Sequence, residues 1–250
     1  MRAGWQISFV AAIDYTGSNG DPRAPNSLHY CGHDQPNQYE QALWNVGGIV
    51  EPYDYDKSFP VYGFGGVPPG QQTSHCFPIN LNLQNPEIVG IPNIVSTYKQ
   101  SISQVELSGP TYFQPILREF RQYVQSLVGR NSYPILLILT DGAIHDMYET
   151  IDEIYELAKL PCSIIIVGVG NADFDAMEEL DGDGGRLRNG NGQPCERDIV
   201  QFVRFNQAVM RGDLAEQVLK EVPRQLVSYM QNRGIEAVPV AHLVDMPPQH

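Results

Sequence analysis

Continuous apolar runs along the chain predict the strands of a buried sheet. Residues 6–13 (QISFVAAI), 135–139 (ILLIL) and 163–167 (SIIIV) are apolar almost throughout, which is typical of parallel strands that are covered on both faces. A shorter strand is predicted at residues 61–64, and residues 199–205 alternate between apolar and polar positions as an edge strand does. These five segments are the candidate strands.

Apolar residues at helical spacing predict helices between these strands. The predicted helices cover residues 39–49, 91–105, 113–127, 147–157 and 214–229. Pro92 and Pro115 lie near the starts of two of them, where proline is tolerated, and Pro223 is expected to bend the last one. The alternation of strands and helices predicts an α/β fold, with a doubly wound, mostly parallel sheet flanked by helices.

The length of 250 residues, 42% of them hydrophobic, suits one α/β domain. We expect a single domain over residues 1–250, with a core at about 6–230 and an irregular C-terminal tail at 231–250. Residues 173–195 are rich in Gly, Asp and Asn and are predicted to form a long surface excursion. No apolar run approaches the roughly 20 residues needed to span a bilayer, so a soluble domain is expected.

Charge and cysteine content narrow the classes of partner. The formal net charge of −13 disfavours direct binding to nucleic acid or to an anionic membrane and favours a cation or a basic protein surface. The four cysteines (Cys31, Cys76, Cys162 and Cys195) are widely separated, without any C-x-x-C pair. We therefore expect free, reduced thiols in a cytosolic setting and no structural zinc.

The ends of the two most apolar strands carry the candidate chemistry. Asp14, Thr16 and Ser18 follow the first strand at alternate positions, and Asp141 follows residues 135–139. In an open α/β sheet, ligands bind beyond the carboxyl ends of the strands. Carboxylate and hydroxyl oxygens aimed at one point suit Mg²⁺ better than Zn²⁺, although each residue taken alone is also an ordinary turn or capping residue.

Several longer segments resemble copines. They are AIDYTGSNGDP (12–22), SLHY (27–30), QPN (35–37), YGFG (62–65), GPT (109–111), LTDG (139–142), SIIIVGVGNADF (163–174) and RDIVQFV (197–203). These segments occur in order, and the resemblance extends to about Met230. It implies a domain similar to the von Willebrand factor A fold, which is the C-terminal domain of copines.

The resemblance also implies a metal-ion-dependent adhesion site. Its ligands here would be Asp14, Thr16, Ser18, Thr111 and Asp141, holding Mg²⁺ or Mn²⁺, with Ca²⁺ as a further option. Thr111 is identified by the resemblance alone, and Thr16 stands where many such domains have Ser, which keeps the hydroxyl. The implied function is non-enzymatic: binding the acidic group of a protein partner through a shared cation.

The family resemblance also implies a context for the whole protein. Copines carry two C2 domains, absent from this chain, that bind phospholipid when Ca²⁺ is present. We therefore expect a parent protein in membrane trafficking or signalling, cytoplasmic and peripherally associated with the plasma membrane. The alternative is the similar domain of RING-type ubiquitin ligases, but no cluster of Cys and His ligands follows Cys195.

Other motifs are weaker. A Mg²⁺-dependent phosphohydrolase of the haloacid dehalogenase type needs D-x-D, and its second carboxylate is replaced by Thr16. The GVG segment at 168–170 lacks the third glycine of a dinucleotide loop and is interpreted as a tight strand exit. DGDG at 181–184 lacks the later EF-hand residues and is predicted to be a solvated acidic loop. His29, His33 and His75 are predicted to be surface or hydrogen-bonded histidines without ligand spacing.

Overall fold

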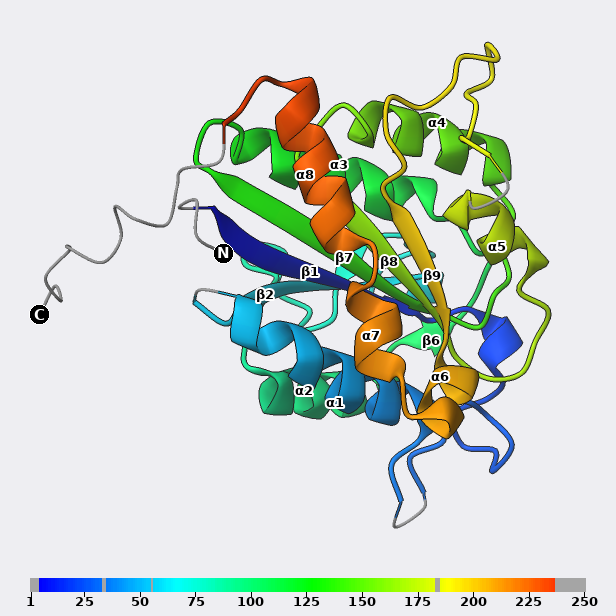
Figure 1. The fold of residues 1–250 in the computed structure, drawn as a ribbon. Coiled ribbons are helices and arrows are strands. Elements are labelled where there is room, and N and C mark those ends of the chain that lie inside the picture. Colours follow the sequence, from blue (N-terminus) through cyan, green and yellow to red (C-terminus); the bar gives the residue numbers. More distant parts are fainter. Residues whose placement is uncertain (1–4, 33–34, 55, 183–184, 237–250) are drawn as a thin grey trace, which may run out of the picture.

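A computed structural model describes residues 5–32, 35–54, 56–182 and 185–236. Its main sheet has the order β4-β2-β1-β7-β8-β9, and β5 also pairs with β2 (Figure 1). The parallel strands are β1 (Gln6–Asp14), β2 (Ser58–Phe64), β7 (Ser132–Thr140), β8 (Ser163–Gly168) and β9 (Val200–Arg204); β4 (Phe77–Pro78) and β5 (Glu87–Val89) are antiparallel to β2. The predicted α/β fold with a mostly parallel sheet is confirmed.

Helices cover both faces of this sheet (Figure 1). One face packs against α1 (Gln38–Val50), α2 (Ile91–Ile102), α7 (Leu214–Leu219) and α8 (Val222–Asn232), and the other against α3 (Gln114–Ser126), α4 (Met147–Leu157) and α5 (Asp175–Asp181). Successive strand residues serve opposite cores: Phe9 and Ala11 belong to the first cluster, and Val10 and Ala12 to the second. This two-sided burial explains the continuous apolar runs in the sequence.

Small elements complete the fold around the carboxyl ends of the strands. They are η1 (Gly17–Asn19), η2 (Glu51–Tyr53), a separate two-stranded sheet of β3 (Gly66–Val67) and β6 (Glu106–Leu107), and α6 (Phe205–Arg211). In the described part of the chain, none of the helices is both long enough and apolar enough to cross a membrane. The tail predicted from residue 231 falls largely on residues 237–250, outside the described residues, and the single-domain boundaries stay a prediction.

Three predictions about the C-terminal half are wrong. The single helix predicted at 214–229 is two helices, α7 and α8, because Pro223 has no N–H to donate to Leu219 and its ring would clash with that residue's carbonyl. Proline therefore lies in the first turn of a new helix. The surface excursion predicted at 173–195 contains α5, whose Met177 and Leu180 are buried. The last residue of α5, Asp181, was predicted to be solvated, but its carboxylate accepts a 2.7 Å hydrogen bond from the Phe202 N–H.

The edge position of β9 is confirmed, but its alternation is not. Residues Val200 to Val203 are all buried, because α5 and α7 pack against this strand. The order of the strands also fixes where a site can lie. The chain passes from β1 to β2 on one side and later to β7 on the other, so the topological switch point lies between the ends of β1 and β7.

Candidate functional site

The loop after β1 brings three predicted ligands into direct contact. The Asp14 Oδ1 atom accepts hydrogen bonds from the Thr16 N–H at 2.8 Å and from the Thr16 Oγ1 at 2.5 Å. The hydroxyl oxygens of Thr16 and Ser18 are 3.0 Å apart. A short 3-10 turn, η1, begins at Gly17 and carries Ser18. Three oxygen-bearing side chains therefore converge within five residues of the chain.

The end of β7 supplies a second side of the same site. Because Ile13 pairs with Leu139 in the parallel ladder, the next residues, Asp14 and Thr140, lie side by side. Thr140 Oγ1 donates a 2.8 Å hydrogen bond to Asp14 Oδ2. Asp141 follows, with one carboxylate oxygen 3.3 Å from the Ala143 N–H. Thr140 is not among the predicted ligands, and its contact with Asp14 joins two strand ends that are far apart in the sequence.

A third loop carries Thr111, which is 1% exposed. Its backbone N–H lies 3.2 Å from His145 Nδ1, and its carbonyl accepts a 2.9 Å bond from the His145 N–H. Three residues before Thr111, the Ser108 carbonyl accepts a 2.6 Å bond from the Gly17 N–H. These backbone contacts tie the Thr111 loop to both other loops, whereas Asp14, Thr16 and Ser18 are joined through their side chains.

The two carboxylates are buried close to one another. Asp14 is 0% exposed and Asp141 is 5% exposed. Burial, followed by the negative charge of Asp141, raises the pKa of Asp14 to about 7, although hydrogen bonds from Thr16 and Thr140 oppose the shift. Among the ion pairs of the described residues, none gives a Lys or Arg partner to either aspartate. The site therefore concentrates negative charge without a protein cation.

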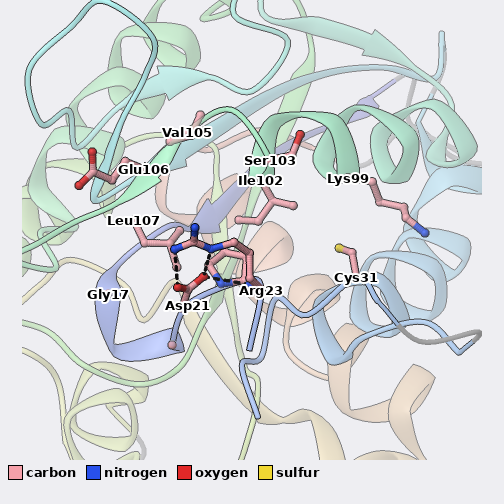
Figure 2. A pocket seen from close by; sticks show the side chains of 12 residues that line it. Gly17, Asp21, Arg23, Cys31, Lys99, Ile102, Ser103, Val105, Glu106 and Leu107 are labelled. Atoms are coloured by element: carbon pink, nitrogen blue, oxygen red, sulfur yellow. Dashed lines mark hydrogen bonds and ion pairs between the residues drawn. The ribbon is translucent and has the colours of Figure 1, made fainter. Parts of the chain in front are cut away.

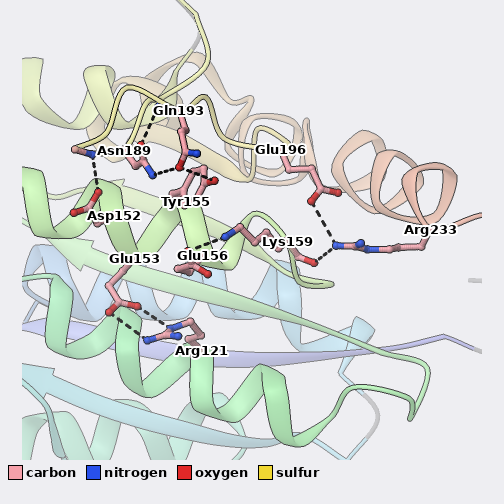
Figure 3. A network of polar contacts seen from close by, with 11 residues as sticks. Arg121, Asp152, Glu153, Tyr155, Glu156, Lys159, Asn189, Gln193, Glu196 and Arg233 are labelled. Atoms are coloured by element: carbon pink, nitrogen blue, oxygen red, sulfur yellow. Dashed lines mark hydrogen bonds and ion pairs between the residues drawn. The ribbon is translucent and has the colours of Figure 1, made fainter.

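Another buried carboxylate of the molecule is treated differently. Glu153 on α4 is 7% exposed, and its Oε2 lies 2.9 Å from Arg121 Nε on α3 (Figure 3). Arg118 lies 3.5 Å from the other oxygen. The fold can thus bring arginines to a buried acid where that acid has a structural role. The contrast makes the missing counter-charge at Asp14 informative.

The donor set can be compared with the preferences of metal ions. The five predicted ligands offer two carboxylates and three hydroxyls, all of them hard oxygen donors, and no nitrogen or sulfur. This chemistry fits Mg²⁺ or Mn²⁺. Within the described ranges, no group of three or more His, Cys, Asp and Glu side chains could hold a metal. The proposed set contains only two such side chains, Asp14 and Asp141, and three hydroxyls.

A groove begins beside this site, at Gly17 (Figure 2). Its volume is about 660 Å³, and it is lined by the 20–23 segment, by the end of α2 and by β6. Two basic side chains line it. Arg23 is paired at 2.7 Å with Asp21, and Lys99 is paired at 3.1 Å with Glu40. The groove is therefore open to solvent, charged at its sides and continuous with the loop that carries Ser18.

The remaining candidates have structural explanations. The four cysteines are free, as predicted, and Cys162 and Cys195 are buried. The GVG segment is a strand exit in which the Val169 N–H bonds to the Thr140 carbonyl at 2.8 Å. His29 is fully buried, with Nδ1 2.7 Å from the Tyr98 hydroxyl. His33 and half of the 181–184 segment lie outside the described residues.

Comparison with known proteins gives a family. The family model described as Copine matches residues 27–238. Among solved structures, the manganese-loaded TRAP protein of Plasmodium vivax is similar with a TM-score of 0.50 and 13% identity, covering 84% of this chain and 72% of that chain. The SpRpn10 VWA domain has a TM-score of 0.49 and 8% identity, covering 80% of this chain and 87% of that chain. A von Willebrand factor type A structure from Catenulispora acidiphila has a TM-score of 0.42 and 14% identity, covering 90% of this chain and 43% of that chain.

Proposed function

The chain belongs to the copine family, and from this premise we propose that it is a protein-interaction domain that binds an acidic group of a partner through a divalent cation. The cation would be held by Asp14, Thr16, Ser18, Thr111 and Asp141. One observation carries the proposal: two buried aspartates lie at the switch point of the sheet, close enough for the charge of one to raise the pKa of the other. A divalent cation would supply the charge that the described protein groups do not.

The hydroxyl groups explain why such a cation would remain available to a partner. Only two of the five proposed ligands are carboxylates, and the hydroxyls of Thr16, Ser18 and Thr111 add donors without further negative charge, so a divalent cation keeps its affinity for carboxylate oxygen. A carboxylate from outside therefore still finds a favourable site. The groove beside Gly17 supports this proposal, because it offers space for the chain segment on either side of that carboxylate.

The same chemistry supports a binding module over an enzyme. Thr16 occupies the position where a phosphohydrolase of the D-x-D type needs an acid or base, and its hydroxyl is occupied as a donor to Asp14. We further propose that phospholipid binding belongs to C2 domains of a longer parent protein, which would be cytoplasmic and peripherally associated with the plasma membrane. The similar domain of a RING-type ubiquitin ligase is the alternative parent.

A calorimetric titration tests the proposal. Wild-type protein, freed of metal with EDTA, is titrated with Mg²⁺, Mn²⁺ and Ca²⁺ in turn; Mn²⁺ is included because the similar TRAP structure is described as manganese-loaded. We expect saturable binding of one cation per chain. Asp14→Ala and Asp141→Asn should each abolish it while the far-UV circular dichroism spectrum stays unchanged. Asp21→Asn, in the same loop but exposed, is the matched control and should bind normally.

Two results would count against the proposal. Absence of binding for all three cations in the wild type would remove the basis of the adhesion site. Binding that survives both Asp14→Ala and Asp141→Asn would place the cation elsewhere. The partner's role can be followed with a short acidic peptide added to the Mn²⁺-loaded protein, where displacement of a metal-bound water lowers the relaxation enhancement of water protons. A peptide with the same sequence but Asn in place of Asp should have no effect.

A further inference from the structure

The side-chain amide of Asn19 is buried beside the loop that carries the proposed ligands Thr16 and Ser18. The Asn19 side chain is 2% exposed, and its Nδ2 donates to the Thr16 carbonyl at 3.1 Å and, more weakly, to Thr16 Oγ1 at 3.4 Å. The backbone of Asn19 is fixed as well, since its N–H lies 3.2 Å from the same carbonyl and its own carbonyl accepts from the Leu28 N–H at 3.0 Å. Asn19 therefore contacts Thr16 through both backbone and side chain.

The orientation of that amide depends on a tyrosine from another element. Tyr39, in the first turn of α1 and 0% exposed, donates its hydroxyl proton to Asn19 Oδ1 at 2.7 Å. A phenol has one proton to donate, so this bond places the amide oxygen toward Tyr39 and the NH₂ group toward Thr16. In the flipped orientation, the NH₂ group of Asn19 would face the Tyr39 hydroxyl. Its oxygen would then face the Thr16 carbonyl, which cannot donate a hydrogen bond.

The tyrosine itself is held rigidly. Its ring stacks on His29 with centroids 4.3 Å apart, and the start of α1 is fixed by a capping box between Asn37 and Glu40. A chain of contacts thus runs from the helix start through Tyr39 and Asn19 to Thr16. It ends at the Thr16 hydroxyl, which donates its proton to Asp14 and keeps its lone pairs as acceptors.

We propose that Asn19 and Tyr39 are positioning residues that fix the ligating hydroxyl of Thr16, and that this pair sets the cation affinity of the site without touching the ion. The inference rests on the proposed cation-dependent function. Its physical basis is general: groups that hold the ligands of a metal in place change affinity by about 10- to 100-fold when they are removed. Here Asn19 lies in η1 beside Ser18, whereas Tyr39 comes from α1, a helix that carries none of the proposed ligands.

The buried aromatic cluster of Tyr15, His29, Tyr39 and Tyr98 supplies matched controls. Tyr98 and Tyr15 are as fully buried as Tyr39, but their hydroxyls bond to His29 Nδ1 at 2.7 Å and to Ser101 Oγ at 2.5 Å. Each of the three changes to Phe removes one buried hydroxyl and its hydrogen bonding, which for Tyr98 includes a longer 3.3 Å bond from Asn37 Nδ2. Only Tyr39→Phe releases the Asn19 amide, so general loosening of the cluster can be separated from loss of the link to Thr16.

The test measures Mn²⁺ affinity by electron paramagnetic resonance and, separately, the urea unfolding of the cation-free protein. Tyr39→Phe should weaken Mn²⁺ binding about 10-fold. Tyr98→Phe and Tyr15→Phe should leave the affinity within about twofold of wild type, with stability losses similar to that of Tyr39→Phe. Asn19→Ala should weaken binding at least as much as Tyr39→Phe. The double variant should be no weaker than Asn19→Ala alone, because Tyr39 acts through Asn19.

Each outcome has one meaning. Equal Mn²⁺ affinity in wild type, Tyr39→Phe and Asn19→Ala overturns the inference and leaves the proposed function standing. Equal weakening by all three tyrosine variants also overturns it, because the effect would then belong to the cluster as a whole. A wild-type protein that binds no Mn²⁺ refutes the proposed function itself. Additive losses in the double variant would show that the two residues act separately and would remove the link between them.

Discussion

Buried charges at the two ends of the sheet are handled in opposite ways. Near the amino end of β8, Arg197 is 2% exposed and has no carboxylate partner among the ion pairs of the described residues. Its guanidinium donates instead to four backbone carbonyls, those of Ala158, Leu160, Cys162 and Gln225. At the carboxyl end, Asp14 and Asp141 are buried with like charge beside like charge.

This difference indicates which of the buried charges has a role in holding the fold together. The carbonyls that surround Arg197 include one at the end of α4, where unpaired carbonyls and the helix dipole favour a cation. Four of the five guanidinium N–H groups have a carbonyl acceptor within the protein. Asp14 receives hydrogen bonds from two threonines, yet the repulsion between Asp14 and Asp141 persists. A charge that the protein satisfies holds the fold together, whereas one that it leaves unbalanced favours an ion from outside.

Removing the satisfied charge should have the largest effect on stability. Arg197→Met takes one donor away from each of four carbonyls, at least two of which keep another donor, and removes a buried charge that the fold is built around; we expect the free energy of unfolding to fall by about 3 kcal/mol. Urea unfolding measures the change. Arg224→Met removes an arginine whose side chain is 72% exposed and should cost less than about 1 kcal/mol. If the two variants lose equal stability, Arg197 does not have the structural role assigned to it.

Backbone packing at the carboxyl end of the sheet can be tested by a substitution at Gly65, which directly follows β2. Its φ is +74°, and a Cβ there would lie 2.1 Å from Thr16 Cγ2. Gly65→Ala should therefore destabilise the protein by about 3 kcal/mol, from the left-handed conformation and from the clash. Thr16→Ser keeps the hydroxyl and removes the clashing methyl. In that background Gly65→Ala should cost only about 1–2 kcal/mol, the conformational part. A double-mutant cycle without coupling would contradict this contact.

The sequence placed Asp14 and Asp141 at the ends of two strands, as the structure does, because each follows a continuous apolar run. A buried parallel strand is recognisable from local composition, and the end of such a strand is where side chains can converge. The short helices α5 and α6 were missed because each spans only seven residues, too few for a helical period to be distinctive. Local pattern thus predicted the frame of the sheet and failed where elements are short.

The contacts around the proposed ligands could not be predicted in this way. Thr140 bonds to Asp14 across 126 residues, and Tyr39 bonds to Asn19 across 20. In the sequence Tyr39 is one member of an apolar helical stripe, and nothing in the stripe indicates that its hydroxyl has a specific partner. Thr111 was found through family resemblance alone, since a threonine after Gly-Pro has no periodic signal. Register and tertiary packing, which depend on the whole sheet, determine these contacts.

The pH dependence of the cation-free protein isolates the repulsion between the aspartates. The folded pKa of Asp14 is about 7, above its ordinary value of 3.8. Its contribution to stability is therefore complete below about pH 4 and is lost as the pH rises toward 7. Asp141→Asn removes the neighbouring charge, which lowers the folded pKa of Asp14. At pH 8 with EDTA this variant should be more stable than wild type, by on the order of 1–2 kcal/mol.

Urea unfolding at a series of pH values between 4 and 8 measures this effect, with Glu149→Gln as the control. Glu149 lies in the first turn of α4 and is exposed, so its variant should follow the wild-type profile. Saturating Mn²⁺ should reverse the ranking at pH 8, because the cation stabilises wild type and not Asp141→Asn. A variant profile that coincides with wild type with and without Mn²⁺ would mean that the two carboxylates do not share one site, and the contrast with Arg197 would then lose its basis.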